Sequence, residues 1–293
     1  MIEWLFFALL AVLFWTSTNL IDKILVTDHF KNPLMNTLIS GSISPFFGLF
    51  ILAFIKFEVP STEFIFLSVF SGLIVFLGNY FYFHSLKEEE VSRVAPFFLS
   101  MSIFILIFSA IFLKEVLSFN QYTGIILIVS GAVILSIKKG FRITLNKSIF
   151  FALTSSFLYA IVYVISKHLL SFQDFFVLFA FQGFGIGLGA LITVFFFKDF
   201  FKEAKKKMNA TKWALLSETL GSIGSFSNLI AVSMAFVSLV GAIPAFQPLF
   251  VLILASIISF FNPKLLKEEL KKTTLIQKFF SILIMVYGST LLI

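Results

Sequence analysis

Long apolar runs separated by short polar breaks dominate the chain. A helix needs roughly 20 apolar residues to cross the hydrocarbon core of a bilayer, and the sequence contains ten runs near that length. We predict helices near residues 4–26, 34–55, 63–84, 94–112, 121–137, 148–167, 175–197, 213–235, 242–261 and 275–293. This pattern predicts an all-α, multi-pass integral membrane protein with ten transmembrane helices.

The composition supports a membrane protein. Of the 293 residues, 59% are hydrophobic and only 13% are charged, against about 25% charged residues in an average soluble protein. We therefore expect the plasma (cell) membrane as the location, the lipid bilayer as a partner, and no nucleic acid partner. The chain has no cysteine, which excludes disulfides, thiolate nucleophiles and thiolate metal sites.

The two halves of the chain begin with similar segments. FFALLAVLFW begins at Phe6 and FFALTSSFLY at Phe150, and Lys23 and Lys167 follow at the same offset (150 − 6 = 144; 167 − 23 = 144). This recurrence predicts two repeats of five helices, residues 1–140 and 141–293. Because five is odd, successive copies enter the membrane from opposite sides, and the repeats are inverted.

Inverted repeats have a functional consequence. Two related halves can exchange roles, one opening inward while the other opens outward, around a site near the middle of the bilayer. The duplication therefore predicts a transporter that works by alternating access. A duplication that merely enlarges a helical bundle is the alternative.

One segment carries a family resemblance. FLKEVLSFNQYTGIILIVSGAVIL at 112–135 places Glu115 in a short turn before a helix that contains Gly124 and Gly131. With the two five-helix halves, this segment resembles the EamA-like branch of the drug/metabolite transporter (DMT) superfamily. The second half keeps Glu268 and Gly288 but has a polar run at 274–278 in place of the first helix glycine.

The resemblance covers the whole chain and rests on architecture rather than on a short catalytic signature. It implies a carrier that is a monomer or a weak dimer, with a central cavity and a small-molecule substrate. Members of this family often export amino acids or other small metabolites.

The charge distribution and the resemblance imply opposite orientations. Eighteen Lys and Arg residues fall in the connections that follow the odd-numbered predicted helices, against three in the alternate connections. Because positive loops usually face the cytoplasm, this bias predicts both termini outside. The resembling family is usually drawn with both termini in the cytoplasm.

Polar residues inside apolar helices indicate the interior of a bundle, because hydrocarbon offers them no hydrogen-bond partners. The candidates for substrate binding or coupling are Glu218, Asn228, Asn79, Trp15, Asn19, Tyr159, Tyr163 and Gln247. Pro96 and Pro244 occupy matching places in the repeats and are candidates for gating bends. The alternatives are hydrogen bonds between helices for the asparagines and a harmless first-turn position for each proline.

Glu218 is the acidic residue placed deepest within a predicted helix. Helical periodicity puts Gly221, Ser222 and Ser225 on its side, with Asn228 one turn beyond. The stripe either lines a path for protons or substrate, or packs against a neighbouring helix with a structurally bonded carboxyl. Asp22 falls near the end of its helix, where an interfacial role is expected.

Other kinds of site are not indicated. His29, His84 and His168 stand apart without metal-ligand spacing, and neither nucleotide-binding motifs nor membrane-protease motifs occur. We therefore expect no enzyme activity, no metal and no cofactor, and coupling to an ion gradient or to exchange. The sequence predicts a secondary transporter that exports a small polar or amphipathic metabolite such as an amino acid. A multidrug exporter of lipophilic cations and a non-transporting membrane scaffold are the alternatives.

Overall fold

The computed structural model describes residues 3–30, 32–88, 97–136, 147–197, 199–251, 253–254 and 272–292. Every regular element within these ranges is a helix, and none of the described residues belongs to a strand. The all-α class predicted from the apolar runs is therefore confirmed.

Within the described residues, the first half contains five long or medium helices and two π-helical turns. α1 spans Glu3–Ile24 and continues into the π-helical turn η1 at Leu25–His29. The others are α2 Leu34–Phe54, α3 Thr62–Glu88, α5 Ser100–Phe108 with the π-helical turn η2 at Ser109–Leu113, and α6 Phe119–Ser136.

The second half has more interruptions. Its elements are α7 Lys147–Leu169, α8 Phe175–Phe196, the short α9 Phe200–Lys206, α10 Met208–Met234, α11 Val237–Val240, the 3-10 turn η3 Ile243–Phe246, and α13 Lys272–Thr290. The predicted helix at 242–261 differs from the structure at its start, because α11 and η3 precede the helical residues 247–251. Its residues beyond 254 lie outside the described part of the chain.

Five described helical segments are long and apolar enough to cross a bilayer: Glu3–His29, Leu34–Phe54, Thr62–Glu88, Lys147–Leu169 and Phe175–Phe196. Shorter apolar segments occupy Ser100–Leu113, Phe119–Leu135 and Val237–Val251. α10 has 27 residues but is not in this set, and its serines, Asn228 and Glu218 lower its hydropathy. The number of spanning helices therefore stays a prediction.

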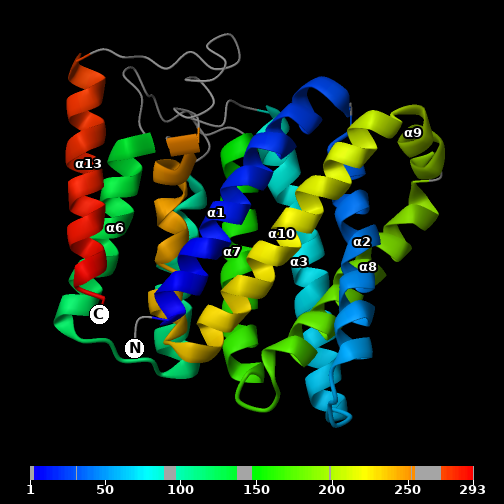
Figure 1. Cartoon of the computed structure of the whole chain (residues 1–293), viewed down its shortest axis with the longest axis horizontal. Helices are drawn as coiled ribbons and strands as arrows, with labels where there is room; N and C mark the ends of the chain where they lie inside the picture. The colour runs from blue at the N-terminus through cyan, green and yellow to red at the C-terminus, as the bar shows by residue number, and fades with distance from the viewer. Residues whose placement is uncertain are drawn as a thin grey trace.

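The helices pack as intimate pairs drawn from distant parts of the sequence. α1 runs along α10, α3 along α7, α2 against α8, and α6 against α13 (Figure 1). α6 and α13 stand at one edge of the bundle, away from α2 and α8 (Figure 1). The two chain ends lie toward one end of the bundle, and the lysine-rich α9 lies toward the other (Figure 1).

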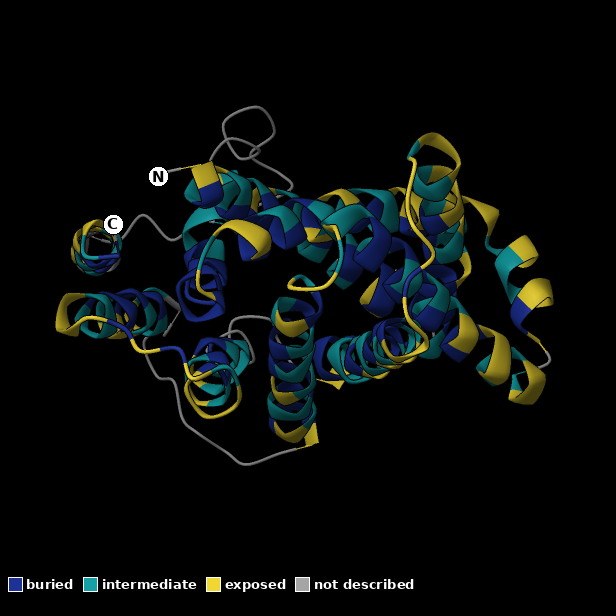
Figure 2. Ribbon diagram, turned by 90° about the horizontal axis from the view of Figure 1, so that it is seen from below, coloured by how far each residue is buried: buried dark blue, intermediate teal, exposed yellow. Residues whose placement is uncertain are grey.

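The burial pattern is that of a membrane protein, with apolar side chains outside and small polar side chains inside. Large apolar side chains project outward, including Phe46, Phe50 and Phe54 on α2, which are 64–77% exposed. Small polar side chains such as Thr16 and Ser71 are fully buried, and the buried positions turn toward the centre of the bundle (Figure 2). Lipid solvates the apolar exterior, while the polar groups find partners between helices.

Glycines allow the closest helix crossings. A Cβ atom on Gly185 of α8 would lie 2.1 Å from the Val69 carbonyl oxygen and 2.9 Å from Gly72 Cα on α3. Gly124 of α6 and Gly288 of α13 meet in the same way, each with the other's carbonyl oxygen within 2.8 Å of its built Cβ. Backbones approach this closely only where the side chain is a hydrogen.

We predict that Gly185→Ala destabilises the protein by about 1–3 kcal/mol, because the added methyl group overlaps the α3 backbone and forces the helices apart. Gly221→Ala is the matched control, since its new Cβ would meet only Thr18 Cγ2 at 3.6 Å. Thermal unfolding of both variants in detergent or nanodiscs measures the difference. An unfolding temperature for Gly185→Ala equal to that of the control would contradict the crossing.

Candidate functional site

α10 carries a polar stripe that faces the inside of the bundle. Glu218 is half-buried and Ser222 is buried, whereas Ser225 is exposed. Leu216 and Ile223, on the opposite side of the helix, are 44% and 40% exposed and face outward. Glu218 and Ser225 therefore lie on the side of α10 opposite to these apolar residues.

Side chains from three other helices surround the Glu218 carboxyl. The Ser40 hydroxyl of α2 lies beside it, and the Asp22 carboxyl of α1 is close enough to interact with it electrostatically. The phenol of Tyr159 on α7 is also within electrostatic range of Glu218. Four helices thus meet around this carboxyl.

Asp22 belongs to this site, which differs from the expectation of an interfacial residue. Its side chain is only 8% exposed, and Ser217 Oγ of α10 donates a 2.7 Å hydrogen bond to Asp22 Oδ1. α1 continues into η1 up to His29, which sets Asp22 roughly 10 Å below the end of the helical segment. The neighbouring Lys23 is half-buried, and its Nζ donates to the carbonyl oxygen of the buried Leu86 on α3 at 2.6 Å.

Amide and phenol groups extend the network to α3. Asn79 Nδ2 donates to Ser40 Oγ at 3.1 Å, and the Tyr159 hydroxyl donates to Asn79 Oδ1. The Tyr82 hydroxyl donates to Asn19 Oδ1 and lies within electrostatic range of Asp22. The structure therefore brings Glu218, Asn79, Asn19 and Tyr159 together in one network.

The remaining sequence candidates lie elsewhere. Tyr163 donates a 3.0 Å hydrogen bond to Asn228 Oδ1, which joins α7 to α10, and Trp15 packs against Gly224 of α10. Pro244 is buried in η3, at the start of a helical segment, and Gln247 follows it half-buried. Pro96 lies outside the described residues.

Most hydroxyl groups of α1 have a local role. Thr16 donates to the Val12 carbonyl oxygen, Ser17 to that of Leu13 and Thr18 to that of Trp15. These groups satisfy themselves within their own helix. The polar face of α1 is thus reduced to Asn19 and Asp22, three residues apart.

A neutral polar cluster was missed by the sequence analysis. Gln182 of α8 donates from Nε2 to Ser71 Oγ at 3.0 Å and to Ser166 Oγ at 2.8 Å. All three side chains are buried. A lone glutamine in the apolar segment FFVLFAFQGFGIGLGALITVFF was the available signal.

A buried carboxylate and a half-buried ammonium group hold the break between α10 and α11. Lys114 adopts a left-handed backbone (φ 54°) that ends η2, and the next residue, Glu115, reaches the start of α11. Its Oε1 accepts from Val237 N at 2.8 Å, and its Oε2 accepts from Ser238 N at 3.1 Å and from Ser238 Oγ at 2.5 Å. A carboxylate is a favourable acceptor for the unpaired N–H groups at the start of a helix.

The opposite charge binds the end of α10. Lys167 of α7 donates from Nζ to the carbonyl oxygens of Val232 at 2.8 Å and Ala235 at 2.6 Å. Lys167 and Glu115 also attract each other. Unpaired carbonyl oxygens at a helix end favour a cation, so the two side chains complement both sides of the break.

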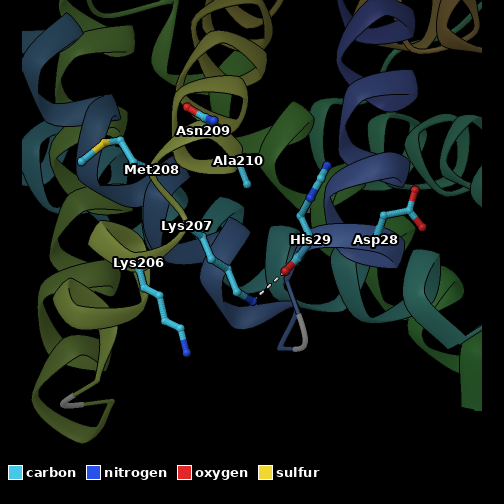
Figure 3. A pocket seen from close by; sticks show the side chains of 7 residues that line it. All are labelled: Asp28, His29, Lys206, Lys207, Met208, Asn209 and Ala210. Carbon is cyan, nitrogen blue, oxygen red and sulfur yellow. Dashed lines mark hydrogen bonds between the residues drawn. The ribbon is translucent and has the colours of Figure 1, made fainter.

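A cavity of about 400 Å³ lies at the corner between η1 and the start of α10 (Figure 3). Lys207 crosses it, donating from Nζ to the His29 carbonyl oxygen at 2.6 Å and to Glu203 Oε1 at 3.1 Å. The same Nζ sits 5.5 Å from the centroid of the Phe30 ring. These contacts tie α10 to η1, and the cavity stands apart from the Glu218 network.

No group of three or more His, Asp or Glu side chains among the described residues could hold a metal ion. Comparison with known families gives the clearest assignment. The family model of the EamA-like transporter family matches residues 2–137. The first half of the chain thus carries the sequence pattern of the EamA-like transporter family. The resemblance seen in the sequence is confirmed.

The assignment makes the protein a membrane transporter of the DMT superfamily and a multi-pass integral membrane protein. Members of the EamA family are transporters, not enzymes. A crystal structure of another protein matches 98% of this chain and 94% of its own, with a TM-score of 0.68 and 16% identity. At that identity the likeness shows the fold alone. No curated protein matches the chain.

We predict that Glu115→Ala destabilises the protein by about 1–3 kcal/mol, because three donors at the start of α11 lose their acceptor. Glu115→Gln should cost less, since its amide oxygen still accepts. The control is Glu58→Ala, which removes an exposed carboxyl from the loop after α2. Thermal unfolding of the three variants decides, and equal values for Glu115→Ala and Glu58→Ala would overturn the capping role.

Proposed function

We propose that this protein is a secondary transporter that exports a small polar or amphipathic metabolite, such as an amino acid, by alternating access. The observation that carries the proposal is the polar network between α1, α2, α3, α7 and α10, with the Asp22 and Glu218 carboxyls at its centre. Ionisable groups within apolar helices are costly unless they are paired or hydrated, and they often mark the path of a substrate or an ion. The network supplies binding groups from both halves of the chain.

We further propose that residues 1–140 and 141–293 are inverted repeats and that ten helices span the membrane. Matching contacts in the two halves support this. Lys23 bonds the Leu86 carbonyl oxygen as Lys167 bonds that of Val232. The lysines are offset by 144 positions (167 − 23) and the carbonyls by 146 (232 − 86). The two bonds, each from a lysine Nζ to a backbone carbonyl oxygen, therefore occupy corresponding places in the two halves.

A second pair of contacts follows the same offsets. Tyr159 packs against Gly78, and Trp15 packs against Gly224, with offsets of 144 (159 − 15) and 146 (224 − 78). These offsets align Asn228 with Tyr82 (228 − 82 = 146). The Tyr82–Asn19 and Tyr163–Asn228 bonds then correspond, with donor and acceptor interchanged between the halves.

The remaining parts of the proposal follow from this mechanism. The chain acts in the plasma membrane. It works as a monomer or weak dimer, because the network lies within a single chain. The gradient of an ion, or exchange of one solute for another, supplies the driving force, since the sequence has no ATP-binding motif. The transported molecule contacts Glu218, Asn79, Asn19 and Tyr159, while Trp15, Tyr163 and Asn228 hold α1, α7 and α10 around it.

Reconstitution tests the function. Purified protein in liposomes should move at least one member of a labelled library of amino acids and other small metabolites down an imposed gradient, at a rate well above empty liposomes. A scaffold would move none. Protection of cells against ethidium-like cations, together with the absence of metabolite transport, would favour the multidrug exporter instead.

Pro244 is the proposed gating position in the described part of the chain. It follows the break after α10 and the short α11, where the backbone is already interrupted. We predict that Pro244→Ala slows transport in the same liposomes while the yield and unfolding temperature of the protein change little. Unchanged transport would show that the proline merely starts a helix, where it is harmless.

A further inference from the structure

The Asp22 and Glu218 carboxyls have no cationic partner among the described residues. Asp22 accepts a hydrogen bond from the neutral Ser217 hydroxyl, and Glu218 adjoins the neutral Ser40 hydroxyl. The adjacent Lys23 directs its Nζ to the Leu86 carbonyl oxygen instead. Two interacting carboxylates in an apolar bundle are costly without a compensating positive charge.

Other elements packed around the pair supply phenols but no cation that faces it. The titratable groups within its electrostatic range are Tyr82 on α3 and Tyr159 on α7. α2 and α8 carry no charged residue, and Lys167 binds carbonyl oxygens at the far end of α10. Other charged groups lie toward the start of α10: the exposed Lys212 on α10 itself, about 9 Å before Glu218 by helical rise, and Asp28, His29, Lys206 and Lys207 at the cavity, roughly 12 Å before it.

An unsatisfied amide lies on the same side of α2. Asn36 is only 3% exposed, and neither its oxygen nor its nitrogen has a hydrogen-bond partner in the described structure. It precedes Ser40 by four residues, so the two side chains project from the same face of the helix. Because Ser40 adjoins Glu218, this face is directed toward the carboxyl pair. A buried amide oxygen without a donor indicates that a donor is missing.

The corresponding place in the other half requires no charge. With the offsets given above, Ser166 corresponds to Asp22 (166 − 22 = 144) and Ser71 to Ser217 (217 − 71 = 146). There Gln182 joins the two serines through neutral hydrogen bonds. The corresponding contact between α7 and α3 thus forms without any carboxyl. Stability of the fold therefore does not explain why the α1–α10 contact carries two carboxyls.

We propose that the Asp22–Glu218 pair binds an ammonium group of the transported molecule, and that protons replace this group when it leaves. The inference rests on the transport function proposed above and adds a substrate class to it. The ammonium N–H groups donate to the two carboxylates, and the Asn36 oxygen is available as a further acceptor. When the ammonium departs, protons from water neutralise the carboxylates, so substrate and protons compete for one site.

Binding measurements in nanodiscs test the proposal. The probes are phenethylamine, putrescine and lysine, each compared with a neutral-ended analogue: 2-phenylethanol, 1,4-butanediol and norleucine. At least one amine should raise the unfolding temperature more than its analogue. It should also bind more tightly at pH 8 than at pH 6, because protons occupy the carboxylates at lower pH, and should release protons that buffers of different ionisation enthalpy reveal in calorimetry.

Glu218→Gln and Asp22→Asn keep the shape of each side chain and remove its charge. Each should weaken binding of that amine by about tenfold or more and abolish the proton release, while the exposed control Glu58→Gln binds like the wild type. If Asp22→Asn does not fold, Glu218→Gln alone decides. The proposal is wrong if no amine exceeds its analogue, or if both variants bind amines with the same affinity and proton release as the wild type.

Transport in liposomes separates this inference from the function on which it rests. If the wild type moves a metabolite and both variants move it at the same rate and with the same pH dependence, the protein is a transporter but the carboxyl pair is not its cation site. If the wild type moves nothing in the library, the transport function itself fails.

Discussion

Hydrogen bonding between helices in a solvent that offers no hydrogen bonds is the constraint on which this structure depends. A polar group left alone in hydrocarbon costs several kcal/mol, so each one must find a partner on its own helix or on a neighbour. The serines and threonines of α1 take the first course. Gln182, Tyr163 and Asn79 take the second, and their bonds connect α3, α7, α8, α10 and α2. The same bonds that hold the helices in register therefore determine which polar atoms remain available to a ligand.

Charged side chains divide into two groups under this constraint. Glu115 and Lys167 are satisfied by backbone groups at the break between α10 and α11, where helix ends leave N–H and C=O groups unpaired. They stabilise an interruption that a transporter can bend. Apart from each other, Asp22 and Glu218 contact neutral side chains, the hydroxyls of Ser217 and Ser40. Glu115 and Lys167 therefore stabilise the fold, whereas Asp22 and Glu218 are the candidates for binding a ligand.

The apolar runs predicted the helices well because membrane thickness fixes their length. The alternative reading of Asn79 and Asn228, as hydrogen-bonding groups between helices, also agrees with the structure. What periodicity lacks is the identity of the neighbouring helix. The pairing of α1 with α10 buries Asp22, which its position near a helix end did not suggest, and makes Ser40 and Ser217 part of the site. The break at α11 was hidden because its residues are as apolar as a continuous helix, and its cause, Glu115, lies 122 positions away (237 − 115).

The central claim is that the inner stripe of α10 lines a water-accessible path. Because the natural chain has no cysteine, a single introduced thiol reports this without background. Gly221→Cys places the thiol on the Glu218 side of α10, and Ile223→Cys places it on the outward side. A charged, membrane-impermeant maleimide should label Gly221→Cys in vesicles from one side of the membrane, at a rate that a transported substrate changes, and should leave Ile223→Cys unmodified. Equal resistance of both thiols to the reagent, applied from either side, would contradict the account.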